Sequence, residues 1–350
     1  DIAVLTGEFL LDPNWAANLA ALLGSAKYQN TPAGLTWIRT IDSGTPNGST
    51  NDPLRTSGAA FAHANGLTGA GEVIAFSDGH VSEDHDAIGD ARLAVYSNGP
   101  AFVEDDFGNL EPSEHGTSVV SVAMGNSPDF VGTAPGATGL FGTFETDLEL
   151  AEIGNAALAA GAVAWNNSWG YTTLGLNSIG FNAAFSGPSG QDYLDALRDY
   201  SAVGVVVFAV DNYDTGGAGL MDGLPVLDND LEAGWLAVAN GIPTFVGDVV
   251  DSVYLLSSPC YESARWCIVA DGSWTAAVGS GTDYEETTGS SFAAPQVAGA
   301  LALLAEAFPT LTPHELRIRL LASAEDDFFV ADDTVELADG YFKTYSVLYG

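Results

Sequence analysis

The chain has 350 residues and carries 46 acidic side chains against 9 lysines and arginines, a formal net charge of -37. This charge argues against nucleic acid and anionic membrane surfaces as partners, because both would repel the chain. A hydrophobic content of 47% indicates a globular protein with a substantial core. The most apolar stretch, 292–308, is interrupted by Gln296 and Glu306 and is too short to span a bilayer, so we expect no membrane insertion.

The predicted elements begin with a helix at 14–26, followed by a loop rich in Gly, Ser, Thr and Asn at 41–53. From residue 72 onward, short apolar segments alternate with amphipathic ones. We predict strands at 72–77, 162–168, 205–210 and 234–240, and helices at 115–125, 148–161, 189–204, 291–307 and 312–323. This alternation indicates an α/β fold in one large domain, a parallel sheet with helices on both faces. We expect residues 1–70 to form an N-terminal extension that packs on a catalytic domain of residues 71–350.

Polar side chains stand where the predicted strands end and the helices begin. Asp78 and Asn212 follow strands, and His115 and Ser291 open helices. An acid, an imidazole, an amide and a hydroxyl are the groups of a serine hydrolase, in which Ser attacks, His takes its proton, Asp orients His and the amide binds the oxyanion. Each residue alone has a simpler explanation, such as a helix cap or a turn. The four together, each in a strand-end or helix-start context, favour catalysis.

Six segments resemble the subtilisin-like serine proteases, the subtilases: GLTGAGEVIAFSDG, HGTSVVSVAMG, VGTAPGA, WNNSWG, VVFAVDN and TGSSFAAPQVAG. The resemblance covers about residues 64–325, and the His and Ser segments are its most specific parts. It implies a subtilisin-like fold and an endopeptidase that acts on protein or peptide substrates with no cofactor for the chemistry. It also implies that Asp78, His115 and Ser291 form the triad and that Asn212 serves the oxyanion.

The resemblance further implies a substrate-binding site, with one wall at Ser168, Trp169 and Gly170 and the other at Ala209 and Asp211. Subtilases commonly accept apolar side chains, so we expect broad specificity with apolar residues favoured at P1, the residue on the acyl side of the cleaved bond. The runner-up is a basic P1 residue, because strand alternation places Asp211 on the same face as Ala209.

The sequence departs from the family pattern at two places. Asp78-Gly79-His80 replaces Asp-Thr-Gly or Asp-Ser-Gly, so Asp84 and Asp86 remain alternatives for the triad acid. His80 is either a solvated turn residue or a neighbour of the triad.

Asp211 stands where the family has Gly, and a shift of register by one would make it the oxyanion residue in place of Asn212. Ser290 fills a position that the family usually gives to Thr, and we expect it to be structural.

Cys260 and Cys267 are too few ligands for a structural zinc site, so we predict a local disulfide, with two free thiols as the alternative. A disulfide would place the protein outside the cytosol. The cysteines and the segment LPVLDNDLEAGWLAVAN also resemble the passenger proteases of bacterial autotransporters, which implies a secreted or cell-surface protein. We expect a monomer.

Three acidic segments, at 82–90, 103–111 and 324–336, are candidates for the structural calcium that subtilases often bind, but their spacing assigns no ligands. Two other functions compete with the endopeptidase. An esterase of the α/β-hydrolase class would need a Gly-x-Ser-x-Gly elbow, which the Gly-Ser-Ser-Phe segment around Ser291 does not provide. A catalytically impaired subtilase that serves as a binding or structural module remains the alternative.

Overall fold

The computed structural model describes residues 8–31, 51–89, 92–104, 110–247 and 249–350. At its centre is a sheet with the strand order β10-β8-β7-β6-β1-β5-β2, and β9 pairs with β8. Neighbouring strands along this path are parallel, whereas β9 is antiparallel to β8. The strands are β1 (Val73–Asp78), β2 (Leu93–Ser97), β5 (Thr138–Thr143), β6 (Ala164–Asn167), β7 (Val205–Ala209), β8 (Trp235–Val246), β9 (Val249–Leu255) and β10 (Cys267–Ala270).

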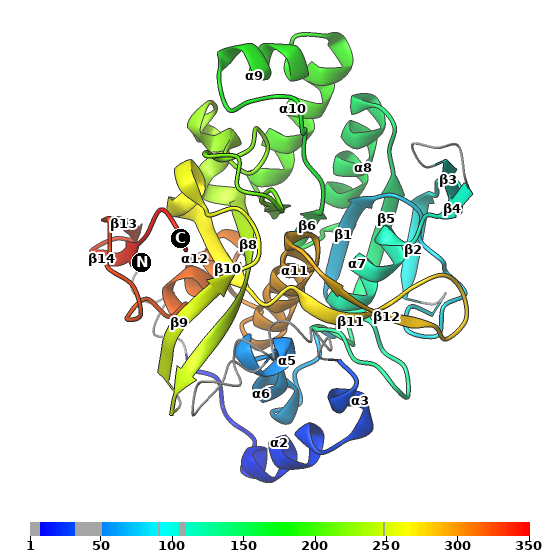
Figure 1. Cartoon of the computed structure of the whole chain (residues 1–350), viewed down its shortest axis with the longest axis vertical. Coiled ribbons are helices and arrows are strands. Elements are labelled where there is room, and N and C mark those ends of the chain that lie inside the picture. Colours follow the sequence, from blue (N-terminus) through cyan, green and yellow to red (C-terminus); the bar gives the residue numbers. More distant parts are fainter. Residues whose placement is uncertain (1–7, 32–50, 90–91, 105–109, 248) are drawn as a thin grey trace.

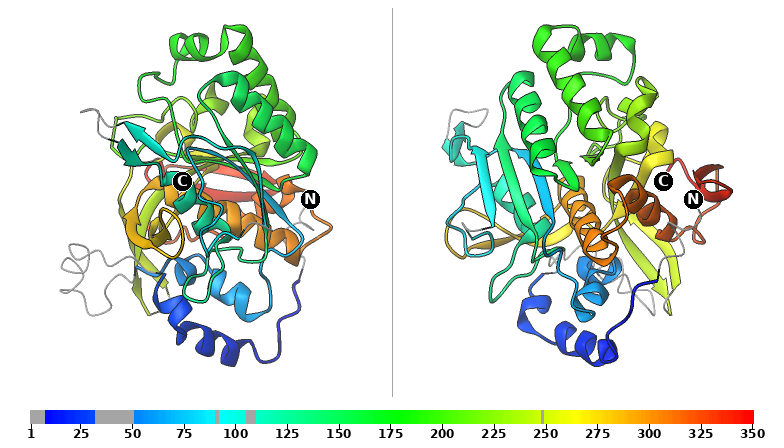
Figure 2. Two further views of the ribbon diagram at one scale, coloured as in Figure 1. Left: turned by 90° about the vertical axis from the view of Figure 1, so that its right-hand side faces the viewer. Right: turned by 180° about the vertical axis from the view of Figure 1, so that it is seen from behind.

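Helices cover both faces of this sheet and enclose two hydrophobic cores (Figures 1 and 2). One core contains side chains of α8 (Asp147–Ala160), α9 (Ser178–Phe185) and α10 (Pro188–Ser201). The other contains side chains of α7 (His115–Met124), α11 (Ser290–Ala307) and α12 (Pro313–Ser323). The predicted fold is therefore confirmed: a mostly parallel sheet with helices on both faces.

In the described part of the chain, three strand pairs lie outside the main sheet: β3 (Phe102–Glu104) with β4 (Leu110–Pro112), β11 (Ser273–Ala277) with β12 (Tyr284–Thr288), and β13 (Asp333–Ala338) with β14 (Tyr341–Tyr345). The hairpin of β11 and β12 leads directly into α11, so it fixes the point at which that helix begins. Short 3-10 turns occur at Leu224–Val226, Asn229–Gly234 and Tyr261–Trp266.

Local sequence explains the main elements. The five residues of β7 are all buried, as expected for a central parallel strand made of β-branched and aromatic side chains. Helix α8 begins with a capping box between Thr146 and Glu149 and ends at Gly161, whose φ of 65° favours glycine. The predicted strands and helices are all present, with ends shifted by up to six residues.

The strand β5 was not predicted, because Gly139 and Gly142 interrupt its apolar pattern. Both glycines are required by packing. A Cβ on Gly139 would lie 2.6 Å from the Leu93 side chain, and one on Gly142 would lie 2.4 Å from Ile153. Glycine therefore allows helix and strand side chains to fill the space beside β5.

The N-terminal helices α2 (Trp15–Leu23), α3 (Ala26–Gln29), α5 (Pro53–Thr56) and α6 (Ala59–Ala64) lie on the side of the molecule opposite α9 (Figure 1). Leu54 belongs to the same core as α11, and the Gln296 side-chain amide of α11 donates to the Pro53 carbonyl at 2.7 Å. This packing supports the proposal that residues 1–70 are an extension held against the catalytic domain. Most of the predicted loop at 41–53 lies outside the described residues.

Within the described ranges, no helix has the length and hydropathy needed to cross a membrane.

Candidate active site

Asp78 and His115 are held together at the edge of the sheet where the parallel strands end. Asp78 is the last residue of β1, and its Oδ1 lies 2.7 Å from Nδ1 of His115, the first residue of α7. The same oxygen accepts the Gly79 N–H at 2.7 Å. The Asp78 side chain is only 4% exposed, whereas that of His115 is 44% exposed. A carboxylate on Nδ1 fixes the tautomer and leaves Nε2 free to act as a base.

The same contact raises the pKa of His115. The negative charge of Asp78 is the main cause, and the hydrogen bond adds to it, whereas burial opposes both. An imidazolium that forms during a reaction would be stabilised by the same charge.

The imidazole of His80, the second residue after Asp78, is bound away from this pair. The Nδ1 of His80 lies 3.0 Å from the carbonyl oxygen of Gly99, so the ring contacts the backbone of the segment that follows β2. The carbonyl of His80 packs against α7: a Cβ on Gly116 would lie 2.5 Å from it. His80 is thus engaged in structure and not in the Asp78–His115 contact.

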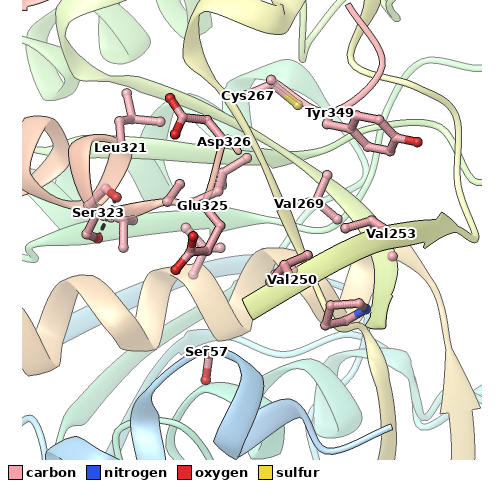
Figure 3. A pocket seen from close by; sticks show the side chains of 18 of the residues that line it. Ser57, Val250, Val253, Cys267, Val269, Leu321, Ser323, Glu325, Asp326 and Tyr349 are labelled. Carbon is pink, nitrogen blue, oxygen red and sulfur yellow. Dashed lines mark hydrogen bonds between the residues drawn. The ribbon is translucent and has the colours of Figure 1, made fainter. Parts of the chain in front are cut away.

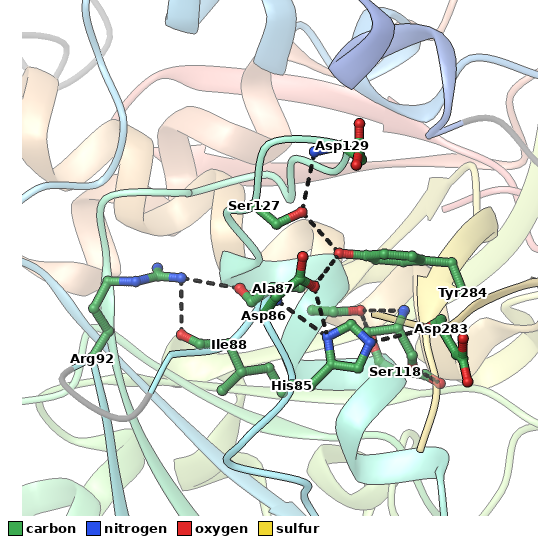
Figure 4. A network of polar contacts seen from close by, with 12 residues as sticks. His85, Asp86, Ala87, Ile88, Arg92, Ser118, Ser127, Asp129, Asp283 and Tyr284 are labelled. Carbon is green, nitrogen blue, oxygen red and sulfur yellow. Dashed lines mark hydrogen bonds and ion pairs between the residues drawn. The ribbon is translucent and has the colours of Figure 1, made fainter. Parts of the chain in front are cut away.

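The two alternative acids do not meet His115. Asp84 is exposed, and Asp86 accepts a hydrogen bond of 2.7 Å from the Tyr284 hydroxyl (Figure 4). In the same network the buried His85 has Nε2 2.8 Å from the Asp283 carbonyl and accepts the Ala87 N–H on Nδ1 at 3.1 Å. These contacts tie the loop after β1 to the segment before β12.

Ser291 lies in the first turn of α11, where backbone N–H groups have no partner within the helix. Its Oγ donates to the Ser168 carbonyl at 3.3 Å, and Ser168 Oγ donates to the Ser291 carbonyl at 2.8 Å. Asn166, inside β6, holds Ser168 Oγ at 3.0 Å. The ring of Phe292, the next residue, lies 5.7 Å from the His115 ring. The sheet edge therefore brings Ser291 into the neighbourhood of His115.

Asn212 is positioned by Ser290. Its Oδ1 accepts the Ser290 N–H at 2.9 Å and the Ser290 hydroxyl at 3.0 Å, and that hydroxyl also donates to the Val210 carbonyl at 2.6 Å. Because Oδ1 of Asn212 accepts hydrogen bonds from α11, the Asn212 amide nitrogen is the group that can donate to another acceptor. A side chain on Gly289 would lie 3.2 Å from Asn212 Oδ1, so glycine keeps this approach close.

The predicted wall at 168–170 lies beyond the end of β6 and is not a strand. The Trp169 ring packs against Phe144 and Phe208, at 4.7 and 5.5 Å between ring centres, so it points into the protein. Gly170 is exposed and faces open space. A peptide bound beside this segment would contact its backbone and not the indole ring of Trp169.

The predicted alternation at the second wall is wrong. The strand β7 ends at Ala209, so the period of two does not reach Asp211. Asn212 turns toward Ser290, while a carboxylate oxygen of Asp211 lies 3.4 Å from where a Cβ on Gly219 would be. Asp222 lies beside the same glycine, at 2.5 Å. The sequence analysis did not identify Asp222, because no local pattern marks it.

The predicted disulfide is present between Cys260 and Cys267. The described part of the chain contains no group of three or more His, Cys, Asp or Glu side chains that could hold a metal ion, so the structural calcium stays a prediction. The acidic segment at 103–111 lies partly outside the described residues.

A cavity of about 430 Å³ lies elsewhere in the molecule (Figure 3). Side chains of β9, α12 and the end of the chain line it, among them Val250, Val253, Leu321 and Tyr349. Asp78, His115, Asn212 and Ser291 are not among its lining residues, so we do not assign it to the chemistry.

Comparison with known proteins finds similarity to subtilisin DY of Bacillus licheniformis, with 28% identity over 265 residues, 75% of this chain and 86% of that protein. Serotype-specific antigen 1 of Mannheimia haemolytica is 27% identical over 183 residues, 49% of this chain and 19% of that protein.

Solved structures with the same fold include the protease domain of PatA (S218A mutant; 25% identity, TM-score 0.56, 75% of this chain and 90% of that one). Another is the PatG macrocyclase in complex with peptide (19% identity, TM-score 0.58, 76% and 87%). A third is fervidolysin from Fervidobacterium pennivorans (20% identity, TM-score 0.55, 79% and 42%). The model of the subtilase family (Peptidase_S8) matches residues 69–341, and on this evidence the chain belongs to the subtilase family.

Proposed function

We propose that this protein is a serine endopeptidase in which Ser291 is the nucleophile, His115 the general base, Asp78 the residue that orients His115, and Asn212 an oxyanion donor. The observation that carries the proposal is the 2.7 Å contact between Asp78 and His115, whose ring lies 5.7 Å from that of Phe292, the residue after Ser291. Membership of a family of serine proteases supports the same conclusion.

In the first step, His115 Nε2 takes the hydroxyl proton as Ser291 Oγ attacks the carbonyl carbon of the scissile peptide bond. The carbonyl π electrons move to oxygen and give a tetrahedral oxyanion. The structure gives the resting hydroxyl a long hydrogen bond of 3.3 Å to Ser168, which a rotation about χ1 can break at little cost. Catalytic hydrogen bonds commonly tighten only when substrate binds.

The oxyanion is stabilised by the Asn212 side-chain amide and the N–H of Ser291, which lies at the positive end of the α11 dipole. Collapse of the intermediate breaks the C–N bond, and the His115 imidazolium gives its proton to the leaving amine. Water, deprotonated by His115, then attacks the acyl-enzyme and releases the carboxylate product and the free Ser291 hydroxyl.

We further propose that the protein acts as a monomer outside the cytosol, secreted or at a cell surface. The disulfide supports this location, since such bonds persist in oxidising compartments. The likeness to autotransporter passenger proteases stays a proposal based on the sequence around 224–240 and the two cysteines.

Labelling with a fluorophosphonate tests the central claim, because this reagent reacts with an activated serine and carries no peptide side chains. We expect labelling at Ser291 in the wild type, none in Ser291→Ala, and strong reduction in His115→Ala. A folded wild type that is neither labelled nor able to cleave a denatured protein substrate would favour the impaired subtilase that serves as a binding module.

A further inference from the structure

A buried carboxyl group beside the site has one oxygen engaged with the Gly219 and Asp222 N–H groups and one oxygen without a partner among the described residues. Asp222 is 4% exposed, and its Oδ2 has no hydrogen-bond partner among the described residues. Its other oxygen, Oδ1, would lie 2.5 Å from a Cβ placed on Gly219. Burial of an unpaired carboxylate is unfavourable, so a group that ionises at this position needs a cation.

Two more carboxylates accompany Asp222. Asp211 Oδ2 lies on the other side of Gly219, 3.4 Å from the same hypothetical Cβ. Glu262 accepts the Ala218 N–H at 2.8 Å, and its charge also acts on Asp222. No ion pair among the described residues engages any of the three: Arg265, the basic residue three positions after Glu262, pairs with Glu232 at 3.1 Å.

This cluster adjoins the proposed catalytic residues. Asp211 directly precedes Asn212, and β7, which leads to Asp211, is the sheet neighbour of β6, which leads to Ser168. Gly219 forms an isolated antiparallel β-bridge with Gly175, which lies five residues after the exposed Gly170. The segment 219–222 is therefore in contact with both chain segments, through Gly175 with the one that follows β6 and through Asp211 with the one that follows β7.

Burial and the neighbouring charge of Asp211 raise the pKa of Asp222 well above its usual range, against the effect of the Gly219 and Asp222 N–H groups. Burial also raises the pKa of Asp211. A bound cation would lower both pKa values, because it favours the charged forms.

We propose that Asp222, with Asp211, binds the cationic side chain of a substrate Lys or Arg at P1, so that the endopeptidase prefers basic P1 residues. This inference rests on the proposed function. Gly219 allows the two carboxylates to lie close together, because a Cβ there would approach Asp222 to 2.5 Å and Asp211 to 3.4 Å. A metal ion fits less well, since no group of three ligating side chains comes together among the described residues.

Peptides that differ only at P1 test the proposal. We expect kcat/KM for Arg and Lys to exceed that for citrulline, the neutral isostere of Arg, and for Leu. Asp222→Asn, which keeps shape and Oδ1, should reduce the ratio of Arg to citrulline by roughly 10²-fold, the scale expected for removal of one partner of a buried ion pair. Asp211→Asn should reduce it less, because Asp211 is more exposed.

The matched control is Asp230→Asn, which removes the same charge from an exposed position in another segment. Its ratio of Arg to citrulline should equal that of the wild type, measured at the same salt concentration. The proposal is overturned if the wild type cleaves citrulline or Leu peptides as well as Arg peptides, or if Asp222→Asn behaves like Asp230→Asn.

Two measurements separate this inference from the proposed function. A wild type that is labelled at Ser291 by fluorophosphonate but shows no basic preference refutes the inference alone. The second measurement is of binding without turnover, with benzamidine, a small aromatic cation, as the probe. Benzamidine should raise the Tm of Ser291→Ala and leave the Tm of the Ser291→Ala/Asp222→Asn double variant unchanged. Equal shifts in both proteins, or none in either, would contradict the site even if the enzyme proved inactive.

Discussion

Replacing Ser290 with Ala removes a hydroxyl that touches the proposed oxyanion amide and lies outside the reacting atoms. Its single hydrogen is shared between the Val210 carbonyl at 2.6 Å and Asn212 Oδ1 at 3.0 Å. In Ser290→Ala the backbone N–H still holds Asn212 Oδ1 at 2.9 Å, so the amide loses one of two restraints. Ser290 is therefore a positioning residue, and its loss should act through Asn212.

The magnitude follows from these contacts. Removal of a whole oxyanion donor costs roughly 10²–10³-fold in kcat, which is the loss expected for Asn212→Ala. Loss of one neutral hydrogen bond that orients the donor is worth about 1 kcal/mol, so kcat should fall roughly 5–10-fold in Ser290→Ala. KM should change little, because the amide acts on the transition state. Stability should fall by about 1 kcal/mol as the buried Val210 carbonyl loses its donor.

A double-mutant cycle provides the assay. Steady-state kcat and KM are measured for the wild type, Ser290→Ala, Asn212→Ala and the double variant, and Ser290→Thr serves as the control that restores the hydroxyl. We expect Ser290→Ala to have little further effect on kcat once Asn212 is gone. If it lowers kcat by the same factor in both backgrounds, or raises KM with kcat unchanged, Ser290 does not act through Asn212.

Four other outcomes are expected. Ser291→Ala should abolish peptidase activity with an unchanged circular dichroism spectrum, and His115→Ala should lose nearly as much because the triad acts as a unit; wild-type turnover in either would end the assignment. Asp78 raises the pKa of His115, and neutral His115 is the base, so kcat/KM should rise with pH through a pKa above about 6.5. The Asp78→Asn variant should have a lower pKa for His115 and a kcat reduced by roughly 10⁴-fold. Reduction of the Cys260–Cys267 bond should lower the free energy of unfolding by only about 2 kcal/mol, since the loop is short, as seen in urea titrations with and without reductant. Self-repulsion from a net charge of -37 should weaken as salt screens it, so Tm should climb with NaCl concentration; a flat profile would contradict this.

The sequence predicted β7 well and missed β5, although β5 lies inside the sheet between β1 and β2. Strands such as β7 are buried on both faces, so their residues form continuous apolar runs that are visible without any partner. By contrast, β5 contains glycines whose purpose appears only when Leu93 and Ile153 are in place beside them. Packing between distant segments decides such strands, and a local pattern cannot report it.

The same distinction holds within the candidate site. His115 and Ser291 stand in segments with specific neighbours, which made them visible in the sequence. The position of Asp211 was derived from strand alternation, which fails because the strand ends two residues earlier. Asp222 becomes notable only because folding buries it beside Asp211 and Gly219.

The two adjacent serines at the start of α11 illustrate how one helix turn separates two tasks. Successive residues on an α-helix point about 100° apart, so consecutive hydroxyls face different neighbours. Ser290 faces the end of β7, where it binds Val210 and Asn212, while Ser291 faces the end of β6, where it binds Ser168. Because β6 and β7 are adjacent parallel strands, Ser168 and Asn212, which follow them, lie at the same edge of the sheet. A single helix start can thus present the nucleophile and hold the amide that serves its oxyanion, and the spacing between them is set by the sheet.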